Sequence, residues 1–278
     1  MTRPFAEVIG DPVAQTRSPA IHRRWLGELG LQGDYCASRV AAAELAGFLD
    51  RRRRDPLWRG CNVTIPHKER VLPLLDRIDG GAAAIGAVNC ILPGSDGLTG
   101  RNTDIDGVGA ALAHARLAGR KAALIGAGGG ARAALQYLVD AGAAEIVILA
   151  REPRKAAHFR RPCPAPRIEV VPLEEPDAAF AGAAAIVNAT PMGMAGAAAM
   201  PERLLASLAV HTAGATLLDM VCQPLETPFL AVGRANGAAA VDGLVMLVGQ
   251  AKAAFRFFFG REPPADDDAL RAALTGGG

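Results

Sequence analysis

Short apolar runs and longer amphipathic segments alternate along almost the whole chain. Runs such as FAEVIG (5–10), KAALIG (121–126) and EIVILA (145–150) have the length and composition of buried strands. Segments with apolar residues at helical spacing follow most of these runs. Strands that alternate with helices in this way predict an α/β fold with a largely parallel sheet.

The pattern forms two successive groups of elements. In the first group we expect strands over 5–10, 34–40, 61–65, 87–92 and 97–101, and helices over 18–30, 41–53 and 67–78. In the second group we expect strands over 121–126, 145–150, 168–172, 184–189 and 215–221, and helices over 106–115, 130–141, 226–236 and 244–259, with a short helix in DDDALRAAL.

Composition limits the class of protein. The chain has 278 residues, of which 50% are hydrophobic, enough for roughly two domains. Its net charge of +2 gives no electrostatic reason to expect a nucleic acid or an acidic membrane as a partner. The stretch 182–201, which is free of charge, is split by Pro191 and by glycines, so no membrane span is expected.

The cysteines indicate a reducing compartment. They number five, an odd count, and include no Cys-x-x-Cys pair, which argues against a disulfide framework or a metal site. We therefore expect a soluble, cytoplasmic, globular protein. Whether it is a monomer or a homodimer stays open.

A glycine loop is the most specific feature that physical reasoning alone can interpret. In AALIGAGGGARAAL, Gly126, Gly128 and Ala131 fit the pattern G-x-G-x-x-G/A, with an apolar strand before it and a helix after it. Gly126 allows the tight turn, and Gly128 lets a pyrophosphate approach the backbone at the helix N-terminus. A glycine-rich turn without a ligand is the alternative, but this context favours a dinucleotide.

The end of the following strand should select the cofactor. It carries Arg151 and Glu152 and no carboxylate before them. Arg151 can stack on adenine and form two hydrogen bonds with a 2′-phosphate, which favours NADP. Glu152 could instead accept hydrogen bonds from the ribose hydroxyls, so NAD remains an alternative.

The segment GCNVTIPHKE, residues 60–69, combines a strand, a proline and a lysine. Asn62 and Thr64 share one face of the predicted strand, because alternate residues point the same way. Pro66 ends that strand, and Lys68 then lies beyond its carboxyl end, where α/β sheets bind ligands. A helix over 67–78 would place Lys68 in its first turn, where the helix dipole slightly disfavours the ammonium form.

Other polar residues exceed what an α/β core needs. They are Thr16, Ser18, Asn89, Asp104 and Gln250. Capping alone would explain Ser18, which precedes Pro19, and Asp104, which precedes a helix. Singly, each has a structural explanation that is at least as good as a functional one.

Together these segments resemble the shikimate dehydrogenase family. The likeness runs in order through nearly the whole chain and rests on TRSP, NVTIPHK, GAVN, NTD, the GAGG loop, NAT (188–190), TPFL (227–230) and DGL..ML..Q. It implies a substrate domain over 1–105, completed by 241–278, and a Rossmann domain over 106–240. It also implies reversible reduction of 3-dehydroshikimate to shikimate by NADPH, on the route through chorismate to the aromatic amino acids.

The resemblance also implies roles for individual residues. Lys68 and Asp104 match the catalytic pair, and a nearby Asp104 carboxylate would favour the Lys68 ammonium. Thr16 and Ser18 match hydroxyls that hold the substrate carboxylate. The groups around the ring hydroxyls correspond to Asn62, Thr64, Asn89 and Gln250. The cofactor positions correspond to Gly126, Ala127, Gly128, Gly129, Gly130, Ala131, Ala150, Arg151, Arg154, Thr190, Met220 and Gly243.

Three positions depart from the family pattern. Cys222 stands where the family usually has a tyrosine that helps to hold the substrate, which puts substrate affinity in question. Val245 replaces a frequent glycine near the nicotinamide, and Ala150 replaces a frequent asparagine before Arg151. Two alternatives follow: a quinate/shikimate dehydrogenase that prefers NAD, and a regulatory relative that binds ligands but turns over little.

Overall fold

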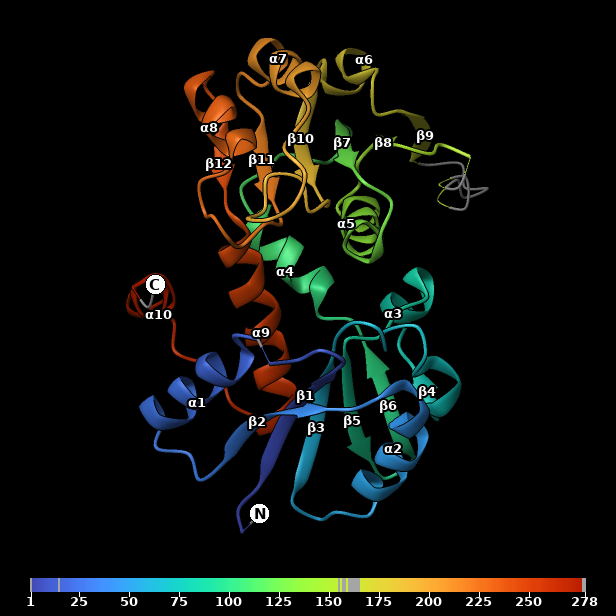
Figure 1. The fold of residues 1–278 in the computed structure, drawn as a ribbon, viewed down its shortest axis with the longest axis vertical. Helices are drawn as coiled ribbons and strands as arrows, with labels where there is room; N and C mark the ends of the chain where they lie inside the picture. Colours follow the sequence, from blue (N-terminus) through green and yellow to red (C-terminus); the bar gives the residue numbers. More distant parts are fainter. Residues whose placement is uncertain (1, 15, 155, 157–158, 160–165, 277–278) are drawn as a thin grey trace. The chain divides into compact units, whose positions relative to one another are not determined.

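The chain forms two compact units, each with its own sheet and core. The computed structural model describes all residues except 1, 15, 155, 157–158, 160–165 and 277–278 (Figure 1). One unit contains the residues up to Thr103 and those from Gln250 onward, and the other contains Asp104–Gly249. The sequence suggests slightly different boundaries, at 105/106 and 240/241.

The chain returns to the first unit at Gln250, later than the sequence suggests, because the start of α9 packs in the second unit. Helix α9 (Gly243–Phe259) begins in the second unit, where Val245 and Met246 pack against its core. Gly249 lies so close to helix α4 (Asp104–Ala111) that a Cβ atom there would be 2.7 Å from Ala110 Cβ. The first turns of α9 therefore belong to the second unit.

The described residues of the first unit form a six-stranded mixed sheet of order β2-β1-β3-β5-β6-β4. Strand β1 pairs in parallel with β2 and β3, whereas β5 is antiparallel to both β3 and β6. The strands are β1 (Phe5–Gly10), β2 (Asp34–Arg39), β3 (Trp58–Val63), β4 (Arg77–Ile78), β5 (Cys90–Gly94) and β6 (Gly97–Arg101). The helices are α1 (Ser18–Glu28), η1 (Ala42–Glu44), α2 (Leu45–Arg53), η2 (Leu72–Leu74), α3 (Gly80–Ile85) and α10 (Asp268–Thr275), with the second part of α9.

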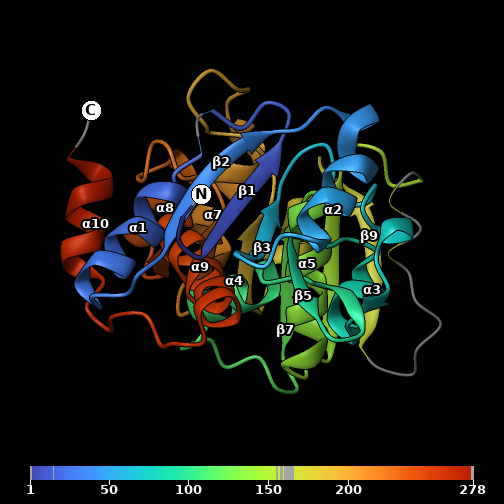
Figure 2. The same ribbon diagram turned by 90° about the horizontal axis from the view of Figure 1, so that it is seen from below.

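Strand β1 is buried on both faces because helices cover both sides of this sheet. Phe5 and Ile9 pack in the core that includes α2, whereas Ala6 and Val8 pack in the core that includes Phe258 of α9. Successive side chains of a strand point to opposite faces, which explains this alternation. Figure 2 shows α1 and α2 flanking strands β1 and β2 from opposite sides.

In the second unit the described residues form a six-stranded parallel sheet of order β12-β11-β10-β7-β8-β9. This is the doubly wound Rossmann order, with its switch point between β7 and β10. The strands are β7 (Lys121–Ile125), β8 (Glu145–Ala150), β9 (Arg167–Pro172), β10 (Ala183–Asn188), β11 (Thr216–Asp219) and β12 (Ala239–Val241). The helices are α4, α5 (Gly129–Asp140), α6 (Pro176–Phe180), α7 (Glu202–His211) and α8 (Pro228–Ala235), with the first turns of α9.

The strands of this sheet also supply two cores. Leu124 and Ile148 pack with α4 and α5, whereas the adjacent Ile125 and Leu149 pack with α6, α7 and α8. This explains why these strands are continuous apolar runs in the sequence. Within the part of the chain that the structure describes, no helix has the length and apolar character needed to cross a bilayer.

The predicted helix over 67–78 is wrong. The segment instead forms turns, the short η2 and strand β4, because Pro73 lacks an N–H donor and disfavours helical backbone in the residue before it. Lys68 therefore does not lie in a helical turn, and the helix-dipole argument for it fails. The predicted strand over 61–65 ends at Val63, and Ile65 is exposed. Sequence reasoning also missed α3, α6, α7 and β12.

A histidine lies in an aromatic cluster of the first unit. His22 of α1 is fully buried, stacks on Tyr35 at 4.1 Å between ring centroids, and also contacts Trp25, Phe255 and Phe258. Neither ring nitrogen has a hydrogen-bond partner among the described residues. Burial lowers the pKa of His22 to about 3, so the imidazole is neutral in the folded protein.

This burial predicts how stability depends on pH. The unfolded chain binds a proton at His22 below about pH 6.5, whereas the folded chain does so only near pH 3, so acid favours unfolding between these values. The His22 contribution to the free energy of unfolding should fall by about 2 kcal/mol between pH 6.5 and 4.5. Urea unfolding of the parent and of His22→Phe at both pH values measures it. An equal fall in the free energy of unfolding of the two proteins between these pH values would contradict the prediction.

Candidate active site

A chain of hydroxyl groups begins at the N-terminus of α1. Thr16 Oγ1 donates to Ser18 Oγ at 3.2 Å and accepts from the Ser18 N–H at 3.3 Å. The Ser18 hydroxyl in turn faces the Tyr35 hydroxyl of β2 and opposes the rise in its pKa. Arg17, not Ser18, is the N-cap of α1, and Ser18 is the first helical residue. The capping explanation of Ser18 is therefore wrong, and its hydroxyl belongs to this polar chain.

The same row of polar groups continues through the buried amides of Asn62 in β3 and of Asn89, which precedes β5. Tyr35 Oη donates to Asn62 Oδ1 at 2.6 Å, and Asn62 Nδ2 donates to the Asn89 carbonyl at 3.1 Å. The Thr103 N–H donates to Asn89 Oδ1 at 2.7 Å, and Thr103 Oγ1 lies 3.4 Å from Gln250 Oε1. Within the first unit, Asn62, Asn89 and Gln250 are thus joined by hydrogen bonds through Thr103. Thr16 and Ser18, which are bonded to each other, face Tyr35 at the Asn62 end of this row.

Lys68 lies on a loop that is anchored through its backbone. Its carbonyl accepts from the Val88 N–H at 2.8 Å, and its buried neighbour His67 places Nε2 2.7 Å from the Val40 carbonyl. Thr64 follows the end of β3, and its N–H donates to the Ile9 carbonyl. These contacts fix the backbone of a half-buried lysine next to the polar chain of the first unit.

Two of the predicted catalytic and substrate-binding residues, Asp104 and Cys222, belong to the second unit. Asp104 is half-buried in the first turn of α4 and directly follows Thr103 in sequence. Cys222 lies in the loop after β11, where its half-buried thiol is 3.8 Å from the Met220 carbonyl. Lys68 and Asp104 belong to different units, and their pairing stays a prediction.

Tyr35 is the functional candidate that sequence reasoning missed. It is fully buried, and burial raises the pKa of its hydroxyl well above its usual value, so it remains protonated. No motif marks it, because DYCASR has the pattern of an ordinary strand. Thr103 stands out in the sequence only as part of NTD, although it bonds to Asn89.

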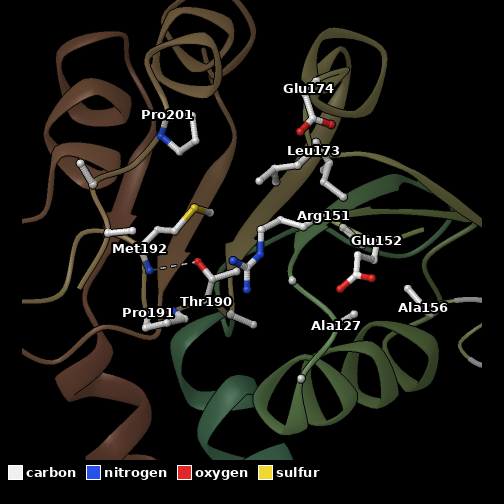
Figure 3. A pocket seen from close by; sticks show the side chains of 17 residues that line it. Ala127, Arg151, Glu152, Ala156, Leu173, Glu174, Thr190, Pro191, Met192 and Pro201 are labelled. Atoms are coloured by element: carbon white, nitrogen blue, oxygen red, sulfur yellow. Dashed lines mark hydrogen bonds between the residues drawn. The ribbon is translucent and has the colours of Figure 1, made fainter. Parts of the chain in front are cut away.

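A cavity of about 750 Å³ lies at the carboxyl ends of the strands of the second unit (Figure 3). Four successive strand ends contribute to it, the location at which doubly wound sheets bind nucleotides. Its lining comprises Gly126, Ala127, Gly128, Leu149, Ala150, Arg151, Glu152, Ala156, Leu173, Glu174, Ala189, Thr190, Pro191, Met192, Ala198, Ala199 and Pro201.

The glycines of the loop have distinct roles. Gly126 has a φ of +107°, and a Cβ there would lie 2.7 Å from Thr190 Cγ2, so only glycine fits without strain. A Cβ at Gly128 or Gly129 would meet nothing within 4 Å, which leaves open space at the N-terminus of α5. Ala131 is buried against the sheet. This geometry suits a phosphate on the free N–H groups of the helix.

The side chains that follow β8 point to different parts of the cavity. Arg151 extends toward Thr190, whereas Glu152 points toward Ala127 and Ala156 (Figure 3). Both are exposed, so they can meet a ligand. Arg154 is also exposed but lies outside the cavity lining.

A buried network holds the loops after β10 and β11. Asn188 Nδ2 donates to Asp219 Oδ1 at 3.0 Å, and Thr227 Oγ1 donates to Asp219 Oδ2 at 2.6 Å. Asn188 Oδ1 accepts from the Thr190 hydroxyl at 2.7 Å, which orients Thr190 in the cavity wall. Burial raises the pKa of Asp219, although these hydrogen bonds oppose the shift.

Met220 and Gly243 lie outside the lining of this cavity but contact each other. A Cβ at Gly243 would be 2.8 Å from the Met220 carbonyl oxygen, and one at Gly130 would be 3.1 Å from Met220 Sδ. Met220 therefore links the glycine loop to the start of α9.

Family comparisons agree with this arrangement. Residues 8–91 match the shikimate dehydrogenase substrate binding domain, 110–195 match shikimate / quinate 5-dehydrogenase, and 243–274 match the shikimate 5′-dehydrogenase C-terminal domain. The shikimate dehydrogenase (NADP(+)) of Sphingopyxis alaskensis is 45% identical over 98% of this chain and 97% of its own length.

Solved structures are also similar. Shikimate 5-dehydrogenase from Thermus thermophilus, in complex with NADP(H) and shikimate, is 34% identical, with a TM-score of 0.79 over 94% of this chain and 95% of its own. The ligand-free 5-ketofructose reductase of Gluconobacter sp. strain CHM43 is 31% identical, with a TM-score of 0.84 over 95% of each chain.

Two glycine variants separate folding from dinucleotide binding. Gly126→Ala should lower the free energy of unfolding by about 1–3 kcal/mol, because a positive φ and a close contact would strain alanine. Gly128→Ala should cost at most about 1 kcal/mol, because its methyl enters open space at a helix N-cap.

The same methyl group at Gly128 would occupy the place of a bound pyrophosphate. We expect Gly128→Ala to raise the Kd for NADP at least about tenfold, the equivalent of one lost hydrogen bond. Urea unfolding and fluorescence titration measure the two effects. A Gly128→Ala protein with parental NADP affinity would show that the dinucleotide binds elsewhere.

Proposed function

Because the chain belongs to the shikimate dehydrogenase family, we propose that it catalyses the reversible reduction of 3-dehydroshikimate to shikimate with NADPH. The single observation that carries this proposal is the row of polar groups from Thr16 to Gln250, beside the loop of Lys68. Such a row of donors and acceptors suits a ligand that carries several hydroxyls and a carboxylate. Supply of shikimate for aromatic amino acid synthesis is then its role.

We assign the substrate carboxylate to the α1 end of this chain. Thr16 and Ser18 offer two hydroxyls within hydrogen-bonding distance of each other, a spacing at which both can donate to one carboxylate. The ring hydroxyls then fall to Asn62, Thr64, Asn89 and Gln250. Cys222 takes the place of the tyrosine that the family uses near the carboxylate, so water would occupy part of that wall.

We assign NADP to the cavity of the second unit. Gly126, Gly128 and the N-terminus of α5 suit the pyrophosphate, and Arg151 suits the 2′-phosphate. When bound, the reduced nicotinamide supplies a hydride to the carbonyl carbon. The proposed domain roles follow: the unit that contains β1–β6 binds substrate, and the unit that contains β7–β12 binds cofactor.

The reaction also needs a proton for the carbonyl oxygen. In reduction the Lys68 ammonium donates it as the oxygen gains negative charge, and in oxidation the neutral amine removes it from the shikimate hydroxyl. The Asp104 carboxylate stabilises the ammonium and orients it. Half-burial of Lys68 and the backbone anchors of its loop support this assignment, because a general acid must be held within reach of its oxygen.

The catalytic assignment predicts the effect of removing the proton donor. Lys68→Met should lower kcat by roughly 10²- to 10⁴-fold, the usual contribution of a general acid–base group, with a native circular dichroism spectrum. Asp104→Asn should also lose activity, and the double variant should lose less than the product, because the two act as a unit. Lys121→Met, at the amino end of β7, serves as the control. A Lys68→Met enzyme within about threefold of the parent would refute the assignment.

The cofactor assignment predicts a selective loss. Arg151→Ala should weaken NADP roughly tenfold to a hundredfold, the equivalent of a hydrogen bond to a charged group, and leave NAD unchanged. Arg167→Ala, at the amino end of β9, is the matched control because it lies at the opposite end of the sheet from the cavity. Equal losses with NADP and NAD would mean that Arg151 does not contact the 2′-phosphate.

A further inference from the structure

The Tyr35 side chain reaches from β2 across β1 to Asn62 on β3. The strand order β2-β1-β3 places it two strands away from Asn62, with β1 between them. Its partner on β1 in the register is Ala6, whose small side chain leaves room for the phenol ring to pass over the strand. The ring thereby brings a hydroxyl from β2 to the amide of Asn62 on β3.

The direction of each hydrogen bond in this group is determined. Asn62 Oδ1 can only accept, so the Tyr35 proton points to it over 2.6 Å. The Ser18 hydroxyl, which faces Tyr35 Oη, can then only donate toward it, while Thr16 donates to Ser18. Asn62 is also anchored through Nδ2, which donates to the Asn89 carbonyl. The two anchors fix which end of the Asn62 amide is oxygen and which is nitrogen.

The Tyr35 ring is itself held rigidly. It is fully buried and stacks face to face on His22, with ring planes 4° apart. Phe258 contacts the ring as well, at 6.3 Å between centroids. Because the ring cannot rotate away, its hydroxyl stays between Ser18 and Asn62 whether or not a ligand is present.

We propose that Tyr35 is a positioning residue that fixes the Asn62 amide in the orientation that shikimate requires. This inference rests on the proposed function, which assigns Ser18 to the substrate carboxylate and Asn62 to a ring hydroxyl. Tyr35 itself lies behind both residues and does not touch the substrate. Its contribution is preorganisation, because the substrate then binds groups that are already ordered.

Removal of the hydroxyl should therefore change substrate binding more than chemistry. Tyr35→Phe should raise the KM for shikimate about 3- to 15-fold, the equivalent of ordering one or two polar side chains. In Tyr35→Phe the Ser18 hydroxyl would also lose an acceptor that competes with the substrate, which favours substrate binding. This gain should be smaller than the loss at the buried Asn62 amide, because a hydroxyl can rotate to another partner. The KM for NADP and kcat should change by less than about twofold, since Lys68 and the cavity of the second unit are untouched.

The chain offers a matched control, because it contains two tyrosines. Tyr137 of α5 packs against the core of the second unit and is not one of the residues that we assign to a ligand. Tyr137→Phe removes the same atom and should leave the KM for shikimate unchanged. A merely structural role of Tyr35 would lower stability without separating the KM for shikimate from the KM for NADP.

A double variant tests whether Tyr35 acts through Asn62. Asn62→Leu alone should raise the KM for shikimate, and Tyr35→Phe combined with Asn62→Leu should raise it by less than about twofold more, because neither partner then leaves an unpaired polar group. The apolar pair also keeps the experiment informative if Tyr35→Phe alone folds poorly. Independent, multiplicative effects of the two changes would overturn the proposal.

Ser18→Ala distinguishes failure of this inference from failure of the proposed site. If Ser18→Ala raises the KM for shikimate and Tyr35→Phe leaves it unchanged, the positioning role of Tyr35 is overturned while the site stands. If neither variant changes it, both the site and the role of Tyr35 are overturned. If Tyr35→Phe raises KM selectively and Tyr137→Phe does not, the positioning role is supported.

Discussion

Most buried polar groups have a hydrogen-bond partner, because leaving one unpaired away from water costs about 1–3 kcal/mol. The first unit depends on this constraint. Tyr35, Asn62, Asn89 and Thr103 are all nine-tenths or more buried, and each satisfies another across strands that are distant in sequence. The surrounding aromatic and aliphatic residues fix where the strands lie. The hydrogen bonds then fix how the polar groups point, and this orientation is what a polyhydroxylated substrate would meet.

The second unit positions its ligand-binding groups in a different way. Its strands bury both faces, so ligand-binding groups can emerge only where the strands end. Asp219 joins Asn188 and Thr227, and this network holds the turns from which Thr190 and Met220 emerge. The glycine loop adds close backbone approach at Gly126 and open space at Gly128. Both units therefore place rigid buried networks behind the residues that we assign to ligands.

The sequence predicted the class of fold and the Rossmann strands, because apolar runs flanked by helices have few other solutions. Predictions from the local sequence failed where a turn or a contact between distant residues determines the structure. The helix over 67–78 had suitable apolar spacing, but Pro73 in its middle breaks it. Ser18 has the sequence context of a cap, yet its hydroxyl faces Tyr35 from another element. Tyr35 itself carried no local signal, because its role depends on a partner 27 residues away.

The central claim is that one unit recognises shikimate and the other recognises NADP. Initial rates with shikimate and quinate, each against NADP and NAD, and of 5-ketofructose reduction by NADPH, test it most directly. We expect the highest kcat/KM for shikimate with NADP, at least about tenfold above shikimate with NAD, since a phosphate contact is worth that much. A higher kcat/KM for quinate with NAD, a preference for the uncharged sugar, or no turnover in any combination would contradict it.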